Sequence, residues 1–254
     1  MLEKLPEALG EALEGVRAGL DQTLFHAVDL RQGMAALKLT SLAFADHAPM
    51  PEKYSADGPG VSPPLAWTGV PAAATEVVLI VEDADSPTPQ PLVHAIAVGL
   101  PARAVAAAVD GTGAVAEALR SAADHGDGAL AEHGDGALAE AAMSAVGDAE
   151  PLVTMGLNSL LREQWLPPDP PPGHGVHRYL FQVFALGPVE GEADPLPESP
   201  GRDALRSAVQ RRGLASGCLT GTYERPSTRI TEPNAQPAFE GLTPIAPAMA
   251  QGAT

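Results

Sequence analysis

Apolar residues recur every three or four positions at the start of the chain, at Leu2, Leu5, Leu9, Leu13, Val16, Leu20 and Leu24. This spacing predicts an amphipathic helix over residues 1–34, with one apolar stripe and acidic residues on its other side. Three glycines weaken the helix in isolation, so the stripe needs a surface to lie on. We expect that surface to be the chain's own domain or a second copy of it in a homodimer. A membrane surface is disfavoured because membrane-surface helices usually carry basic residues on their polar face.

From residue 36 the pattern changes to short runs of β-branched and aromatic residues. The runs are ALKLTSLAF (36–44), EVVLIVED (76–83), VHAIAVGL (93–100), HRYLFQVFAL (177–186) and CLTGTYE (218–224). Bounding Pro, Gly and Asp residues are typical of strands. Because helical patterns do not alternate with these runs, we expect a mostly β protein with an antiparallel sheet or sandwich.

A second helical pattern covers residues 202–216 and carries the chain's only basic cluster, Arg202, Arg206, Arg211 and Arg212. These arginines could pair with acidic neighbours or with the first helix, but we favour a solvated basic face. After Arg225 the chain is rich in proline and poor in large apolar residues, which favours a loose tail over 226–254. The chain is thus divided into a helix (1–34), one domain (35–225) and a tail (226–254).

Residues 102–150 interrupt the domain with an Ala-, Gly- and Asp-rich segment. It contains HGDGALAE at 125–132 and again at 133–140. A single eight-residue duplication cannot form a solenoid, so we interpret the segment as an expanded surface loop. A metal site at His125, Asp127, His133 and Asp135 is the alternative, but glycines leave its geometry unfixed, and we expect no metal.

The chain has 254 residues and a formal net charge of −17. This charge disfavours sequence-independent nucleic-acid binding and electrostatic attachment to anionic lipid. One cysteine, Cys218, excludes an internal disulfide, and we expect it to be a buried small residue. The acidic start lacks a secretory apolar region, and no stretch is long and apolar enough to span a bilayer. We therefore expect a cytoplasmic protein without stable membrane insertion.

Four stretches place rare polar residues beside the predicted strands: DGPGVSPPLAW (57–67), EDADSP (82–87), LVHAIAV (92–98) and PPDPPPGHGVHRYLF (167–181). Each has a plain alternative, because a histidine within a strand is commonly a core residue and paired acids commonly form a turn beside an arginine. Together, however, carboxylates, imidazoles and a rigid proline loop suit a small anion held by ring and backbone N–H donors.

The order of these motifs resembles that of the phosphatidylethanolamine-binding protein family, in particular its bacterial Raf-kinase-inhibitor-like branch. The matching motifs are GPGVSPPLAW, EDADSP, VHAIAVGLP, GLNS, PPDPPPGHGVHRYLFQVFAL and LTGTYE, from about residue 36 to residue 225. The resemblance implies a large central antiparallel sheet, a smaller sheet and flanking helices. It also implies a shallow pocket for phosphate or a phospho-headgroup.

The resemblance assigns ligand-binding residues position by position. We call the motif EDADSP (82–87) the first family box and the motif PPDPPPGHGVHRYLF (167–181) the second. The assigned residues are Asp83, Asp85 and Pro87 in the first box, His94 on the next strand, and Pro171, Gly173, His177 and Tyr179 in the second box. Arg178 matches a family arginine, to which we assign a structural ion pair. Two positions depart from the family pattern. Ser86 adds a hydroxyl at the rim, and Pro167 replaces a glycine and so removes a backbone N–H beside the anion.

We therefore expect a non-enzymatic protein without a cofactor that binds a small anion against His94 and His177, with Asp83 orienting one ring. An inhibitor of a kinase or protease, acting through protein contacts, is the alternative. A hydrolase with Ser62, Ser86 or Ser159 as nucleophile is less favoured, because the chain lacks a Gly-x-Ser-x-Gly elbow, an HExxH motif and a phosphate-binding glycine loop.

Overall fold

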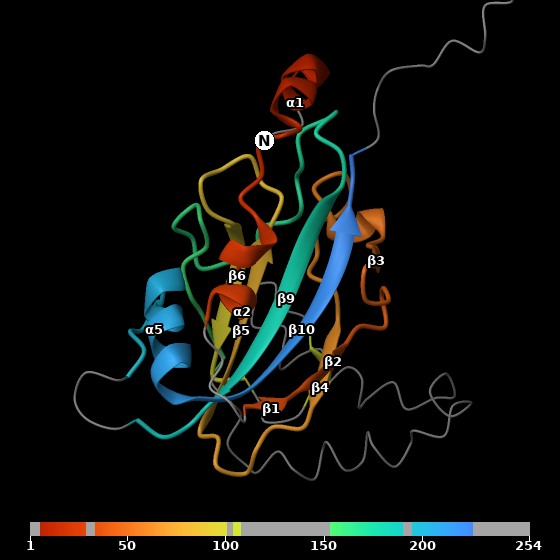
Figure 1. Ribbon diagram of the computed structural model, residues 1–254. Helices are drawn as coiled ribbons and strands as arrows, with labels where there is room; N and C mark the ends of the chain where they lie inside the picture. The colour runs from red at the N-terminus through yellow and green to blue at the C-terminus, as the bar shows by residue number, and fades with distance from the viewer. Residues whose placement is uncertain (1–5, 29–33, 101–103, 108–152, 190–194, 226–254) are drawn as a thin grey trace, which may run out of the picture.

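The computed structural model describes residues 6–28, 34–100, 104–107, 153–189 and 195–225 (Figure 1). Their central element is one large sheet in the order β1–β10–β9–β5–β6–β8, with β3 also beside β10. Its strands are β1 (Ala35–Ala36), β3 (Ala48–Pro49), β5 (Glu76–Asp83), β6 (Leu92–Val98), β8 (Thr154–Met155), β9 (His177–Leu186) and β10 (Gly213–Tyr223). The expectation of a mostly β fold is confirmed.

The large sheet is mixed rather than purely antiparallel. The four long strands β10, β9, β5 and β6 pair antiparallel, but the two-residue strands β1 and β3 both run parallel to β10. A second sheet of three short strands packs beside it, formed by β2 (Lys38–Thr40), β4 (Leu65–Thr68) and β7 (Ala104–Ala107). The predicted combination of a large and a small sheet is therefore present.

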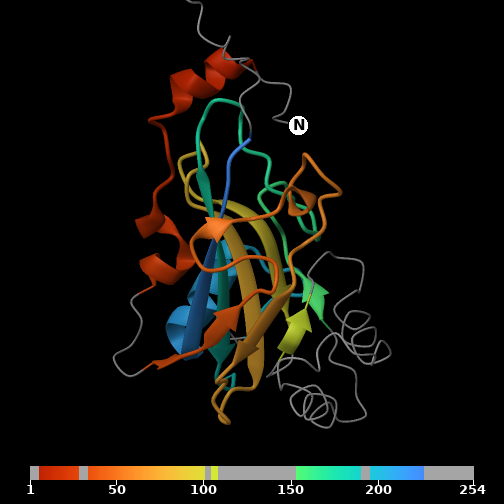
Figure 2. The same cartoon turned by 90° about the vertical axis from the view of Figure 1, so that its right-hand side faces the viewer.

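Strand β5 explains why both faces of the large sheet are covered. Val77, Leu79 and Val81 belong to one core cluster, which includes Leu65 and Trp67 of the small sheet. Val78 and Ile80 belong to the other, together with Leu24 and residues of α5 (Arg202–Arg212). Alternate side chains of a strand point to opposite faces, so a continuous apolar run is buried on both. The molecule has three layers: small sheet, large sheet and helices (Figure 2).

The prediction of one helix over 1–34 is wrong for the residues described. The segment contains α1 (Glu7–Leu13), the 3-10 turn η2 (Leu20–Gln22) and α2 (Leu24–Ala27), with non-helical chain between them. Gly19 has φ of 105°, which no right-handed helix accepts. The apolar stripe is divided as a result: Leu24 of α2 is fully buried against the large sheet, whereas Leu9 and Val16 remain exposed.

The second predicted helix is shorter than expected. It ends at Arg212, and residues 213–216 begin β10, where they pair with β9. The preferred solvated basic face is also wrong for two of its arginines. Arg202 contacts the buried carboxylate of Glu82 at 2.6 Å, and Arg212 contacts Glu76 at 2.7 Å. Their pairing with acidic neighbours leaves less of this helix available to an anionic partner.

Two other sequence interpretations lie outside the described residues: most of the 102–150 loop with its tandem repeat, and the tail over 226–254. η3 (Glu52–Tyr54) completes the described elements. No helix in the described part of the chain has both the length and the apolar character to cross a membrane.

Candidate functional site

The candidate site lies where β5 ends. Asp83, the last residue of β5, faces Tyr179 of β9 in register and is buried. One of its oxygens accepts the backbone N–H of Asp85 at 2.8 Å, which closes a tight turn. Its other oxygen, Oδ2, lies 2.7 Å from Nδ1 of His177. The turn thus fixes the Asp83 carboxylate, and the carboxylate orients the His177 ring.

Asp85 binds arginines instead of facing the rings. Its oxygens accept the backbone N–H, Nε and Nη2 of Arg178 at 2.7–2.8 Å, and Arg17 lies 3.1 Å away. Burial raises the pKa of Asp85, but hydrogen bonds from Arg178 and Arg17 outweigh burial and leave the pKa below its usual value. The structural ion pair expected of Arg178 is present, and Asp85 has a positioning role in this geometry.

His177 and His174 form a chain of ring contacts that ends on the N-terminal segment. Nε2 of His177 lies 2.7 Å from Nδ1 of His174. Nε2 of His174 lies 2.8 Å from the carbonyl oxygen of Leu13 and 3.2 Å from that of Val16. Both rings are buried. The second box is thus linked through two imidazoles to the start of the chain, about 160 residues away.

His94 lies in a second group of rings with unused polar atoms. Its ring meets Tyr179 edge-on at a centroid distance of 5.1 Å and lies 6.1 Å from Trp165. Its Nδ1 contacts the carbonyl oxygen of Leu166 at 2.6 Å. Within the described ranges, Nε2 of His94, Nε1 of Trp165 and the Tyr179 hydroxyl are buried without a hydrogen-bond partner. Such orphaned groups are costly, and they commonly mark a water or ligand position.

The burial of these groups also raises the pKa of the Tyr179 phenol and lowers the pKa of His94, because both charged forms lose their hydration. Nearby Asp83 opposes the shift at His94 but does not cancel it. His94 is therefore neutral at physiological pH. Because its Nδ1 faces a carbonyl oxygen, that nitrogen carries the proton, and Nε2 presents a lone pair.

The family model for phosphatidylethanolamine-binding protein matches residues 40–224, well over half of the chain. The chain belongs to this family.

Relatives and solved structures agree with this membership. A UPF0098 protein of Chlamydia pneumoniae is 31% identical over 189 residues, covering 74% of this chain and 99% of the relative. A UPF0098 protein of Methanothermobacter thermautotrophicus is 29% identical with the same coverage. The crystal structure of CT736 from Chlamydia trachomatis, a homologue of the family, has a TM-score of 0.52 at 29% identity and covers 75% of this chain and 99% of its own. Escherichia coli YbcL, a family member at 19% identity, shares the fold with a TM-score of 0.54 over 76% of this chain and 100% of its own.

The remaining family positions lie around the rings without entering them. Pro171 is buried, and its carbonyl oxygen accepts the backbone N–H of His174. Gly173 has φ of 77° and touches Glu7 of α1. Pro87 follows the Asp83 turn. Ser86 was expected to offer a hydroxyl at the rim, but its hydroxyl is buried and contacts the Asp83 carbonyl oxygen and the Thr88 hydroxyl.

Sequence reasoning missed His174, Trp165 and Arg17. His174 lies in the motif PPDPPPGHGVHRYLF, three residues before His177. A histidine between two glycines does not indicate from the sequence that its ring contacts His177 and Leu13. Arg17 is the only basic residue between positions 5 and 25, within an acidic segment, and this contrast could have drawn attention to it.

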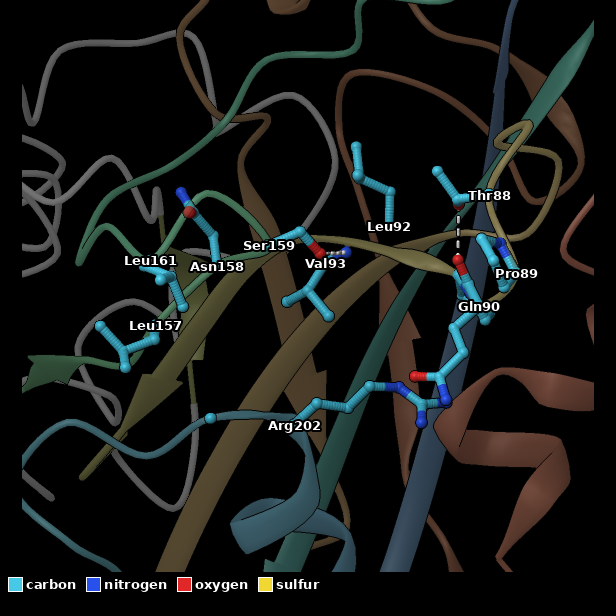
Figure 3. A pocket seen from close by; sticks show the side chains of 12 residues that line it. Thr88, Pro89, Gln90, Leu92, Val93, Leu157, Asn158, Ser159, Leu161 and Arg202 are labelled. Carbon is cyan, nitrogen blue, oxygen red and sulfur yellow. Dashed lines mark hydrogen bonds between the residues drawn. The ribbon is translucent and has the colours of Figure 1, made fainter.

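A separate cavity of about 570 Å³ lies beside the turn that leads into β6 (Figure 3). Its lining is mostly apolar and includes Leu92, Leu157 and Leu161. Its one arginine, Arg202, already binds Glu82 and the backbone of Gln22. The arginine of this cavity is therefore already neutralised by a carboxylate. No group of three or more His, Cys, Asp or Glu residues in the described part of the chain could hold a metal ion.

Proposed function

We propose that this family member is a non-enzymatic binding protein whose pocket takes a small anion, either phosphate or a phospho-headgroup. The anion lies against His94 and His177, with Asp83 orienting the His177 ring. The observation that carries the proposal is the set of three orphaned polar atoms on His94, Trp165 and Tyr179 beside the Asp83–His177 pair.

The chemistry of these atoms favours a phosphate group. The Trp165 N–H and the Tyr179 hydroxyl are donors, whereas Nε2 of neutral His94 is an acceptor. A hydrogen phosphate presents oxygens that accept and an O–H that donates, so it can satisfy both kinds of group. Carboxylates and chloride ions only accept hydrogen bonds and would leave His94 unpaired.

The surroundings of the Asp83–His177 pair support binding over hydrolysis. In a Ser-His-Asp triad, the ring nitrogen opposite the carboxylate faces a nucleophile. Here that nitrogen faces the ring of His174. The hydroxyls of Ser86 and Ser159 serve turn and strand contacts instead. Cys218 is only partly buried, and burial raises the pKa of its thiol to about 12, which keeps it protonated.

Phosphate titration followed by NMR tests the proposal. The indole N–H of Trp165 and the ring signals of His94 and His177 should shift with millimolar phosphate or phosphoethanolamine. The other tryptophan, Trp67, and His47 on the surface provide internal references. Tyr179→Phe removes only the orphaned hydroxyl, so it should weaken phosphate binding about fivefold to tenfold while leaving the fold intact. If no ring near the site responds to either compound, the proposal is wrong.

A further inference from the structure

The N-terminal segment lies directly over the second family box. We name residues 6–16 the strap and residues 17–19 its anchor. In Figure 1 the strap's helix α1 lies at one end of the molecule, above the end of the sheet where β9 begins. A Cβ added to Gly10 would lie 1.9 Å from the carbonyl oxygen of Pro172, and one added to Gly173 would lie 2.9 Å from that of Glu7. The strap and the loop therefore fit in direct backbone contact.

The anchor fixes the strap beside the first family box as well. The backbone N–H of Ala18 donates to Ser86 at 3.0 Å, and that of Gly19 donates to Ala84 at 2.8 Å. Arg17 donates to the carbonyl oxygens of Val176 and His174 and contacts Asp85. The chain between anchor and helix thus crosses from one box to the other.

The chain of contacts from Asp83 through His177 and His174 to Leu13 contains three hydrogen bonds, and each needs one proton. Asp83 and the Leu13 carbonyl oxygen, at the two ends, are both acceptors when Asp83 is ionised. Two neutral imidazoles supply two N–H groups for three hydrogen bonds. One additional proton is therefore needed to complete the chain from Asp83 through His177 and His174 to Leu13.

That proton belongs on His177, beside the Asp83 carboxylate. Burial and the adjacent His177 lower the pKa of His174, so His174 stays neutral and donates from Nε2 to Leu13. If His177 loses this proton and keeps its remaining N–H on Nδ1 toward the Asp83 carboxylate, His174 must move its own proton to Nδ1 to keep the contact between the rings. Its Nε2 lone pair then faces the carbonyl oxygens of Leu13 and Val16, which repels the strap.

The charged and titratable groups around the two rings come from every neighbouring element. They are Asp83 from β5, His94 from β6, Arg178 and Tyr179 from β9, Asp85 from the turn, Arg17 from the anchor, and Glu7 and Glu11 from α1 beside Gly173. Arg17 and Arg178 are both engaged by Asp85. Asp83 is thus the carboxylate in direct contact with the ring pair.

We propose that the strap is a built-in lid on the anion pocket, held shut by one proton shared along Asp83, His177 and His174 and released when that proton is lost. In the closed state Nε2 of His177 is taken by His174, and the strap holds His174 there through the carbonyl oxygens of Leu13 and Val16. An anion can reach that nitrogen only when the strap releases His174. The lid function rests on the proposed anion pocket, whereas the proton-dependent docking does not.

The docking is tested by the mobility of the strap as a function of pH. In the intact protein, the heteronuclear NOE of the Gly10 and Leu13 amides should match that of the sheet at pH 5 and fall when the pH is raised to 8. His174→Gln keeps a side-chain N–H for Leu13 without a titrating ring, so its strap should show no such transition. Proton-dependent docking of the strap, which we call the proton clamp, would be overturned if the strap stayed equally rigid while the chemical shifts of the His177 ring changed with pH. It would also be overturned if the strap of His174→Gln lost its NOE with pH as the natural chain does.

The lid function is tested with a matched pair of glycine variants. Gly10→Ala collides with Pro172, whereas Gly15→Ala meets nothing within 4 Å. At pH 6, Gly10→Ala should bind phosphate about tenfold more tightly than Gly15→Ala. This factor assumes that the lid is closed in about ten of every eleven molecules of Gly15→Ala and open in Gly10→Ala, because only open molecules bind phosphate. Equal affinities would overturn the lid function. If neither variant nor the natural chain binds phosphate, the proposed function fails, and the NOE series still decides whether the clamp exists.

Discussion

Asp85 shows how one residue can connect several parts of the site. It receives three hydrogen bonds from Arg178 and an ion pair from Arg17, so it joins the Asp83 turn, the start of β9 and the strap's anchor. The family motif predicts an aspartate at this position, but its partners could not be derived from the sequence, because they lie 68 residues before it and 93 residues after it.

Replacing Asp85 with Asn should cost about 1.5–3 kcal/mol at pH 7, because Arg178 and Arg17, whose side chains are 38% and 30% exposed, lose their hydrogen bonds to a buried carboxylate. The folded-state pKa of Asp85 is lowered, so its contribution is present above the unfolded value of 3.8 and is lost as pH falls through the lower folded value. Urea unfolding from pH 7 to pH 2 measures both effects.

The difference in stability between the natural chain and Asp85→Asn should therefore shrink only below pH 3.8. Asp203→Asn, at an exposed position on α5, is the control and should change stability by less than about 0.5 kcal/mol. A difference that disappears already near pH 6 would assign the effect to another group.

Leu161 is a second residue whose environment is unusual. It is 78% exposed and has φ of 58°, in the left-handed region that leucine rarely adopts. Asn tolerates this conformation, so Leu161→Asn should raise the free energy of unfolding by about 0.5–1 kcal/mol. Thermal unfolding measures the change, and Leu160→Asn, at a neighbouring exposed leucine without positive φ, should give no gain.

At the scale of elements, Glu82 connects four parts of the fold. Its Oε2 accepts the backbone N–H of Leu24 and the side-chain amide of Gln182, and its Oε1 accepts Nε of Arg202. These partners belong to α2, β9 and α5, and Glu82 itself is on β5. The buried carboxylate thus fixes the helical layer to the sheet.

Glu82→Gln should destabilise the protein by about 3–5 kcal/mol. Both oxygens of Glu82 accept hydrogen bonds, so the NH₂ group of a glutamine would face N–H donors, and Arg202 would lose its counter-charge. Glu76→Gln removes a comparable contact to Arg212, but Glu76 is 24% exposed whereas Glu82 is 0% exposed in their ion pairs. Its cost should be smaller, about 1–2 kcal/mol, because water reaches the Glu76 side of the pair although the Arg212 side chain is only 6% exposed. Equal losses in urea unfolding would contradict this role for Glu82.

The elements predicted best are those whose burial is complete. β5 and β9 begin and end where their apolar runs do, because both faces of each strand are covered. The N-terminal stripe misled the prediction because its periodicity is helical while Gly19 adopts a φ that a helix forbids. Asp83, His94, His177 and Tyr179 were identified by their motifs, and they do come together. The packing of the strap on the second family box and the unpaired Nε1 of Trp165 were not predicted. Both depend on contacts between segments far apart in the sequence, which no local pattern encodes.

At the scale of the whole molecule, the formal charge of −17 acts against the compact state. Raising sodium chloride from about 0.02 M to about 0.2 M screens this repulsion and should raise Tm by a few degrees at pH 7.5. Near the sequence pI of about 4.6 the net charge vanishes, and the salt effect should vanish with it. Calorimetry at the two pH values measures both. An equal rise at both would mean that net charge is not the cause.

The short connection between the strap and its anchor has a consequence for ligand recognition. Only a few residues separate Leu13 from the amides of Ala18 and Gly19, which bind the turn at Ser86 and Ala84. A tether this short confines the strap to a small volume around the His174 ring, equivalent to a millimolar or higher local concentration. On the proposed lid mechanism, an external anion competes with a partner that cannot diffuse away. A compound that binds the open pocket well would register as a weak ligand of the intact chain, and its rank among candidates would depend on the pH of the measurement.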